Sequence, residues 1–179
     1  MLNPAGGFVM HVGGGHWYKN REGLLSIYAQ LRLLLPSAPL LVIVGPPLAA
    51  EHAEIAARLG LTQHIVVLPT VTNPELEALY NVAEALIFPS WEEGFGWPIV
   101  EAQACGCPVF ASRRSPMTEV AGRHAGYFDP NDPTAAAQAI AAAWPQRRAM
   151  RDQALAEAHQ WQPARMIEGY EALYRRLVP

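Results

Sequence analysis

The first unit of the predicted fold is the stretch Phe8-Val9-Met10-His11-Val12-Gly13-Gly14-Gly15, residues 8–15. It begins with a short, mainly apolar run and ends at three glycines. Between Gly23 and Leu35, leucines, Ile27 and Tyr28 then recur at helical intervals. This order predicts a strand, a glycine turn and a helix.

The same unit recurs along the chain as far as about residue 128. Strands are predicted at Leu40 to Val44, Ile65 to Leu68, Ala85 to Phe88, Val109 to Ala111 and near Tyr127-Phe128, and helices at Ala49 to Leu59, Pro74 to Val82 and from about Pro98. These strands are apolar throughout rather than alternating, which is typical of a parallel sheet covered by helices on both faces. The sequence therefore predicts a doubly wound, Rossmann-like α/β domain.

After Asp129-Pro130-Asn131-Asp132-Pro133 the composition becomes that of alanine-rich helices, predicted at Thr134 to Ala143 and Gln146 to His159. A break at Trp161-Gln162-Pro163 precedes a final amphipathic helix. Its apolar face comprises Met166, Ile167, Tyr170, Leu173, Tyr174 and Leu177. Because flanking lysines are missing, we expect this face to belong to the core or to an inter-domain surface rather than to a membrane anchor.

Composition restricts the class of protein. Of the 179 residues 51% are hydrophobic, and the net charge of −3 offers no basic field for a nucleic acid. The two cysteines, Cys105 and Cys107, are too close in sequence for a useful disulfide, which favours a reducing compartment. Met1 to Gly15 is rich in glycine and is not expected to act as a signal peptide, and no apolar run of this sequence reaches about 18 residues. We expect a cytoplasmic protein, with contact to a membrane surface left open.

The loop after Phe88 carries the strongest functional signal, Pro89-Ser90-Trp91-Glu92-Glu93-Gly94-Phe95-Gly96-Trp97-Pro98-Ile99-Val100-Glu101. Its glycines allow a ligand to approach the backbone closely, and Pro98 suits the first turn of a helix. A helix start favours an anion such as phosphate. Glu93 and Glu101 flank this position, and carboxylates accept hydrogen bonds from sugar hydroxyls. This combination predicts a sugar-nucleotide pocket, although each glutamate alone also fits a solvated or dipole-complementing role.

Other ligand classes are disfavoured. Gly13-Gly14-Gly15 lacks the third glycine of a dinucleotide motif, because Tyr18 stands there. None of the six histidines lies in a metal-binding spacing, so no metal is expected. Asp129 and Asp132 are expected in a turn, and packing is the expected role of the two cysteines.

The loop resembles the signature of the group 1, or family four, retaining glycosyltransferases. In that signature two glutamates are separated by seven residues within Pro-Ser-x-x-Glu-Gly-Phe-Gly, as Glu93 and Glu101 are here. The similarity extends to Ala104-Cys105-Gly106-Cys107-Pro108-Val109, to Thr118-Glu119-Val120-Ala121-Gly122, to Gly126-Tyr127-Phe128-Asp129-Pro130 and to the first loop with Lys19. It implies that residues 1–179 are the C-terminal, donor-binding half of a GT-B enzyme, with helices 134–179, and that the N-terminal acceptor domain lies outside this chain.

The resemblance also implies a role for each residue of the site. Glu101 corresponds to the glutamate that holds the ribose hydroxyls, and Glu93 to the one beside the transferred sugar. The Gly94, Phe95 and Gly96 amides would lie beside the sugar and the diphosphate. The first loop, with Gly13 and Gly14, would contact the donor, and Lys19 corresponds to the diphosphate lysine.

One position departs from the family pattern. The family has an arginine directly after the first-loop glycine, where this sequence has Gly14 and Gly15. Arg21 is a candidate substitute. The alternative is that Arg21 faces solvent on its helix.

The function implied by the resemblance is transfer of a hexose from a UDP- or GDP-sugar to a glycan or lipid-linked acceptor, as in polysaccharide biosynthesis. Glu93 would be essential for transfer but not for binding of the bare nucleotide. The reaction would be retaining and independent of metal, and the isolated domain would bind its donor but hardly turn over. Two alternatives stay open, namely a non-catalytic sugar-nucleotide binding module and a GT-B epimerase acting on a nucleotide sugar.

Overall fold

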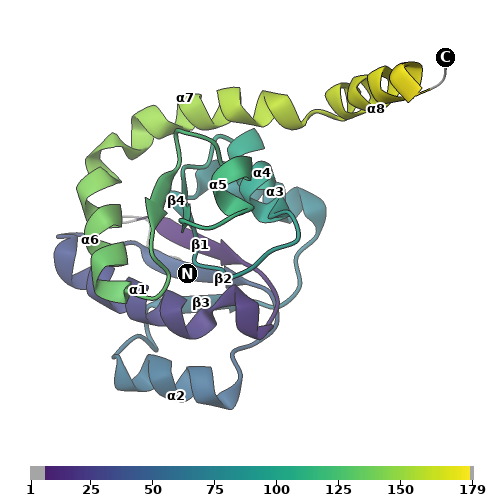
Figure 1. Ribbon diagram of the computed structural model, residues 1–179. Helices are drawn as coiled ribbons and strands as arrows, with labels where there is room; N and C mark the ends of the chain where they lie inside the picture. Colours follow the sequence, from purple (N-terminus) through teal and green to yellow (C-terminus); the bar gives the residue numbers. More distant parts are fainter. Residues whose placement is uncertain (1–6, 178–179) are drawn as a thin grey trace.

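Six parallel strands form one sheet in the order β3-β2-β1-β4-β5-β6 in this computed structural model, which describes residues 7–177 (Figure 1). The strands are β1 (Phe8–Val12), β2 (Leu40–Val44), β3 (Ile65–Leu68), β4 (Ala85–Phe88), β5 (Val109–Ser112) and β6 (Gly126–Phe128). Each neighbouring pair is parallel, with Val9 opposite both Leu41 and Ala85 at the centre. The predicted parallel α/β fold is confirmed.

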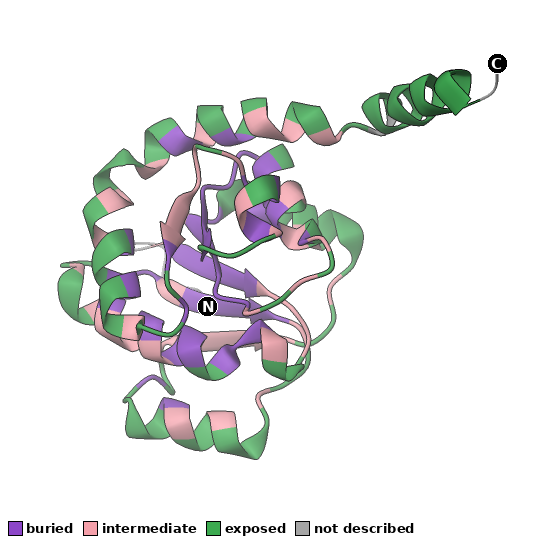
Figure 2. Cartoon of the chain, viewed as in Figure 1, coloured by how far each residue is buried: buried purple, intermediate pink, exposed green. Residues whose placement is uncertain are grey.

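Helices cover both faces of the sheet. They are α1 (Arg21–Leu34), α2 (Ala50–Arg58), α3 (Asn73–Val82), α4 (Trp97–Ala104), α5 (Met117–Val120) and α6 (Pro133–Ala143). Helices α1, α2 and α6 contribute to one apolar cluster, whereas α3, α4 and α5 contribute to the other. Successive residues of a strand enter opposite clusters, as Val9 and Met10 do in β1. This is why the strands are apolar on both faces over most of their length, and why the central strands are buried in Figure 2.

The sequence located the longer elements to within one or two residues. Helix α1 begins at Arg21 rather than at the predicted Gly23, because the Asn20 side chain caps it by accepting from the Gly23 N–H. The short helix α5 was not predicted, and neither were the 3-10 turns η1 (Trp17–Lys19), η2 (Trp144–Gln146) and η3 (His159–Trp161). Such single turns are too short to show a helical period.

The C-terminal helices differ in how they pack. Helix α7 (Arg147–Ala158) lies against α4, whereas α8 (Pro163–Leu177) projects away from the sheet (Figures 1 and 2). All side chains from 164 to 177 are exposed, including the six apolar ones predicted to form one face. This face therefore does not belong to the core of the described domain, and its assignment to an inter-domain surface stays a prediction. Within residues 7–177, no helix combines the length and the apolar character that crossing a bilayer requires.

The sheet order reverses between β1 and β4. From β1 the chain proceeds outward to β2 and β3, and from β4 it proceeds outward in the other direction. In open parallel sheets, ligands bind at the carboxyl ends of the strands at such a switch point. The loops that follow β1 and β4 are therefore where the site is expected.

Candidate functional site

The loops after β1 and β4 lie side by side at the switch point. The first turns at Gly13 to Gly15 and enters η1, and the second runs from Pro89 to the start of α4. The Trp91 N–H donates to the Tyr18 carbonyl at 2.8 Å, which ties the two loops together. Residues far apart in sequence consequently meet at one edge of the sheet.

An ion pair joins these loops. Lys19 Nζ donates to Glu93 Oε1 at 2.7 Å, and the two side chains are only 11% and 8% exposed. The ammonium also lies 5.0 Å from the centre of the Phe88 ring. A charged pair so little exposed to water is screened weakly, so each partner fixes the other's position.

Gly13 makes room for the Lys19 side chain. A Cβ on Gly13 would lie 3.0 Å from Lys19 Cδ and 3.4 Å from His11 Nε2, so a larger residue would displace the lysine. Gly14, at the position of the family's arginine, is half-buried. A Cβ there would lie 3.1 Å from His16 Cδ2.

The start of α4 has backbone N–H groups that no side chain caps. Its N-cap is Gly96, with φ of 98°, a left-handed conformation that favours glycine, and no side chain caps the helix. A Cβ on Gly94 would meet nothing within 4 Å. The Phe95 ring instead packs against Trp97 and Trp161, with ring centroids 4.8 Å and 5.1 Å away. The uncapped helix start suits an anion, and the predicted role of the 94–96 amides stays a prediction.

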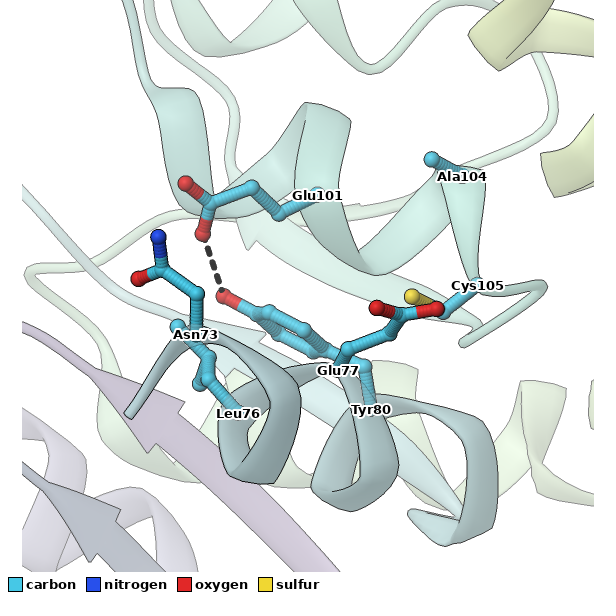
Figure 3. Close-up of a pocket in the computed structure, with 7 residues that line it drawn as sticks. All are labelled: Asn73, Leu76, Glu77, Tyr80, Glu101, Ala104 and Cys105. Carbon is cyan, nitrogen blue, oxygen red and sulfur yellow. Dashed lines mark hydrogen bonds between the residues drawn. The ribbon is translucent and has the colours of Figure 1, made fainter. Parts of the chain in front are cut away.

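Glu101 lies on α4 and contacts α3 rather than the Lys19 loop. The Tyr80 hydroxyl donates to Glu101 Oε2 at 3.0 Å, as Figure 3 shows. Beside this bond is a cavity of about 380 Å³. It is lined by Asn73, Leu76, Glu77, Tyr80, Glu101, Ala104 and Cys105.

The two glutamates of the signature line separate hollows. Glu93 lines a hollow of about 320 Å³ with Tyr18, Glu92 and Gly94, and none of these residues lines the Glu101 cavity. The structure thus brings Lys19 together with Glu93 and Tyr80 together with Glu101. Two separate carboxylates allow the two ends of an extended ligand to be held at different points.

Arg21 is buried, so the alternative that it faces solvent on its helix is wrong. Its guanidinium donates to the carbonyls of Gly13, Pro46 and Pro47 at 2.9 to 3.3 Å, which links the loops after β1 and β2. Burial lowers its pKa. The suggested contact of Arg21 with the donor stays a prediction.

Sequence reasoning missed His11 and Tyr80 as residues of this region. His11 is fully buried in β1, and its Nδ1 donates to the Ile87 carbonyl at 3.1 Å. Burial, opposed by that bond and reinforced by the charges of Arg21 and Lys19, lowers its pKa to about 4, so the ring is neutral at pH 7. For His11, the signal in the sequence was a histidine within an otherwise apolar strand.

The remaining polar candidates have structural roles. Asp129 accepts from the Asn131 backbone N–H at 2.9 Å, and Asp132 caps α6 by accepting from Ala135 at 2.9 Å, which confirms the predicted turn. Cys107 packs in the core, where burial raises the pKa of its thiol to about 12. In the part of the chain that the structure describes, no three His, Cys, Asp or Glu side chains gather in a way that would hold a metal ion.

Comparison with known proteins identifies the family to which these features belong. Residues 3–161 match the family described as "Glycosyl transferases group 1". The D-inositol 3-phosphate glycosyltransferase of Jonesia denitrificans is 34% identical over 138 residues, which are 73% of this chain and 32% of that protein. The O-antigen chain mannosyltransferase B of Escherichia coli is 31% identical over 131 residues, 70% of this chain and 34% of that protein. The chain thus spans about a third of the length of these curated relatives.

Solved structures share the architecture. Sucrose-phosphate synthase from Thermosynechococcus elongatus matches with a TM-score of 0.79 at 25% identity, over 98% of this chain and 46% of that one. TarM matches with a TM-score of 0.80 over 94% of this chain and 35% of that one, at 14% identity, and this likeness concerns the fold alone.

Proposed function

The chain belongs to the group 1 glycosyl transferases, and from this premise we propose that it binds the nucleotide-sugar donor of a retaining hexosyltransferase of GT-B architecture. The donor is a UDP- or GDP-linked hexose. The acceptor, a glycan or a lipid-linked glycan, binds to a domain outside this chain. The relatives named as glycosyltransferases and mannosyltransferase support this class of reaction.

One observation carries the proposal, the 2.7 Å pair of Lys19 and Glu93 at the switch point of the sheet. A diphosphate needs a cation, and the sugar attached to it offers hydroxyls to a carboxylate. Lys19 and Glu93 provide these two groups side by side. The uncapped start of α4 adds backbone N–H groups for phosphate oxygens.

Each residue then has a definite task in transfer. Lys19 and the α4 start stabilise the negative charge that grows on the departing diphosphate. Glu93 orients the hexose, while Glu101 accepts hydrogen bonds from the ribose hydroxyls and anchors the nucleoside end. We further propose that this chemistry needs no metal and that the enzyme works in the cytoplasm, peripherally at a membrane.

Calorimetry with the purified chain tests the proposal. UDP or GDP should bind more tightly than the corresponding monophosphate, because only the diphosphate reaches both Lys19 and the helix start. Lys19→Met should remove most of that preference, whereas the exposed Arg113→Met should not. Equal binding of diphosphate and monophosphate, or binding of neither, contradicts the proposed site.

The second candidate is a sugar-nucleotide binding module without transfer activity. The observation that favours it is Gly14, which leaves the usual arginine position without a charge. Reconstitution with an acceptor-binding half separates the candidates. Transfer of hexose supports the enzyme, whereas tight donor binding without transfer supports the binding module.

A further inference from the structure

The hydrogen bond between Tyr80 and Glu101 joins α3 to α4 at the edge of the Glu101 cavity. We propose that Tyr80 is a positioning residue for the donor, holding the Glu101 carboxylate through Oε2 so that Oε1 accepts from the ribose hydroxyls. This inference rests on the proposed function, in which Glu101 binds the ribose.

The direction of the bond is fixed by chemistry. A carboxylate only accepts, so the Tyr80 hydroxyl is the donor. Tyr80 is 1% exposed, and burial, together with the nearby Glu101 charge, raises its pKa. The hydroxyl therefore keeps its proton at neutral pH.

Glu101 needs such a support because its own surroundings do not hold it. The residue is exposed on α4, and a long flexible side chain loses conformational freedom when it is ordered. The Tyr80 ring, by contrast, is fixed in the core between the two helices. A rigid donor that has already ordered the carboxylate lowers the entropic cost that the ligand would otherwise meet.

The bond also leaves the carboxylate available to a ligand. Among the described residues, Oε2 accepts from Tyr80, and Oε1 has no hydrogen-bond donor. In Figure 3 the Glu101 carboxylate and the Asn73 side chain lie at the same end of the cavity as the Tyr80 hydroxyl. The Tyr80 ring and Leu76 form an apolar wall beside them. The Glu77 carboxylate and Cys105 lie toward the other end of the cavity. The Tyr80 hydroxyl, the Glu101 carboxylate and the Asn73 amide thus form one group of polar atoms beside an apolar wall, as in a site that orients a small molecule.

Calorimetry with two ligands tests the role. The ligands are the nucleoside diphosphate that the wild type binds and its 2′,3′-dideoxy analogue, which lacks the ribose hydroxyls. Tyr80→Phe should weaken the ribonucleotide about three- to tenfold and leave the dideoxy analogue unchanged. In a Glu101→Ala background, Tyr80→Phe should have no further effect, because the group that it positions is absent.

Tyr28→Phe is the matched control. Tyr28 is also fully buried, and its hydroxyl donates to the carbonyls of Pro39 and His64 at 2.7 Å and 3.1 Å, on the opposite face of the sheet. Tyr28→Phe should therefore lower the free energy of unfolding without changing the preference for the ribonucleotide over the dideoxy analogue.

Glu101→Asp is a second test variant, at an exposed position. It keeps the charge but shortens the reach to Tyr80, and it should reduce the same preference.

The outcomes separate this inference from the proposed function. Equal weakening of both ligands by Tyr80→Phe, or no weakening of the ribonucleotide, overturns the positioning role while donor binding stands. If Tyr80→Phe does not fold, an undiminished ribonucleotide preference in Glu101→Asp overturns it. If the wild type binds neither UDP nor GDP, the proposed function fails and the positioning role fails with it.

Discussion

Replacing Glu93 with glutamine should tighten the binding of a bare nucleoside diphosphate. The family resemblance alone predicts no change, because it assigns Glu93 to the sugar. In the structure, however, Glu93 holds Lys19 at 2.7 Å, and a diphosphate has to draw Lys19 away from it. The carboxylate therefore competes with the ligand for the ammonium.

The magnitude follows from the burial of the pair. With side chains 11% and 8% exposed, this hydrogen bond between charged groups should stabilise the free protein by about 1.5–3 kcal/mol. Glutamine keeps an acceptor for the charged ammonium but loses the negative charge, so its bond lies at the lower end of this range, about 1.5 kcal/mol. Binding no longer has to overcome the difference, which is up to about 1.5 kcal/mol, so the affinity for UDP or GDP should rise by up to about tenfold.

Two measurements check this expectation. Calorimetry gives the affinities, and Glu92→Gln serves as the control. Glu92 is the neighbouring residue and is exposed, so this substitution removes the same charge without touching the Lys19–Glu93 pair. Lys19 is the only lysine of the sequence, so isotope-labelled lysine gives a single side-chain NMR signal. That signal should move on diphosphate binding in the wild type. An unchanged or weaker affinity in Glu93→Gln, or an equal gain in Glu92→Gln, would refute the competition.

Three further results are expected. Glu101→Ala should weaken nucleoside diphosphate binding by about 2 kcal/mol, because a charged acceptor for two hydroxyls is lost, and calorimetry that finds unchanged affinity rejects the ribose role. The pKa of His11 is about 4 in the folded protein and 6.5 ordinarily, so the unfolded chain binds the extra proton first. The free energy of unfolding should therefore fall by about 3 kcal/mol as pH drops from 6.5 to 4, and urea titrations should show a shallower fall in His11→Asn. Removing residues 163–179 should change the unfolding free energy by less than about 0.5 kcal/mol, because the side chains from 164 to 177 are exposed, and a larger loss would show that α8 packs on the domain in solution.

Much of the fold could be predicted because its signals are local. Apolar runs such as Leu40 to Val44 indicate strands with helices on both faces of a parallel sheet, and glycines and prolines mark where strands and helices end. The spacing of Glu93 and Glu101 likewise lies within one loop and one helix. A motif of that kind is visible before the fold is known.

The burial of Arg21 could not be predicted in the same way. A helical arginine usually extends into water, but here the loops after β1 and β2 surround it with carbonyls. The exposure of α8 was equally hidden, since an amphipathic face indicates that a helix packs without saying against what.

The sequence by itself determined the strands, the longer helices and the two glutamates, because each depends on residues that are neighbours along the chain. Only the tertiary structure decided which side chains of the site contact each other. Lys19 reaches Glu93 across 74 positions, and Tyr80 reaches Glu101 across 21, from loops and helices brought together by the sheet. Such pairings depend on how the β1 and β4 loops and α3 and α4 pack in space, and no local periodicity encodes that packing.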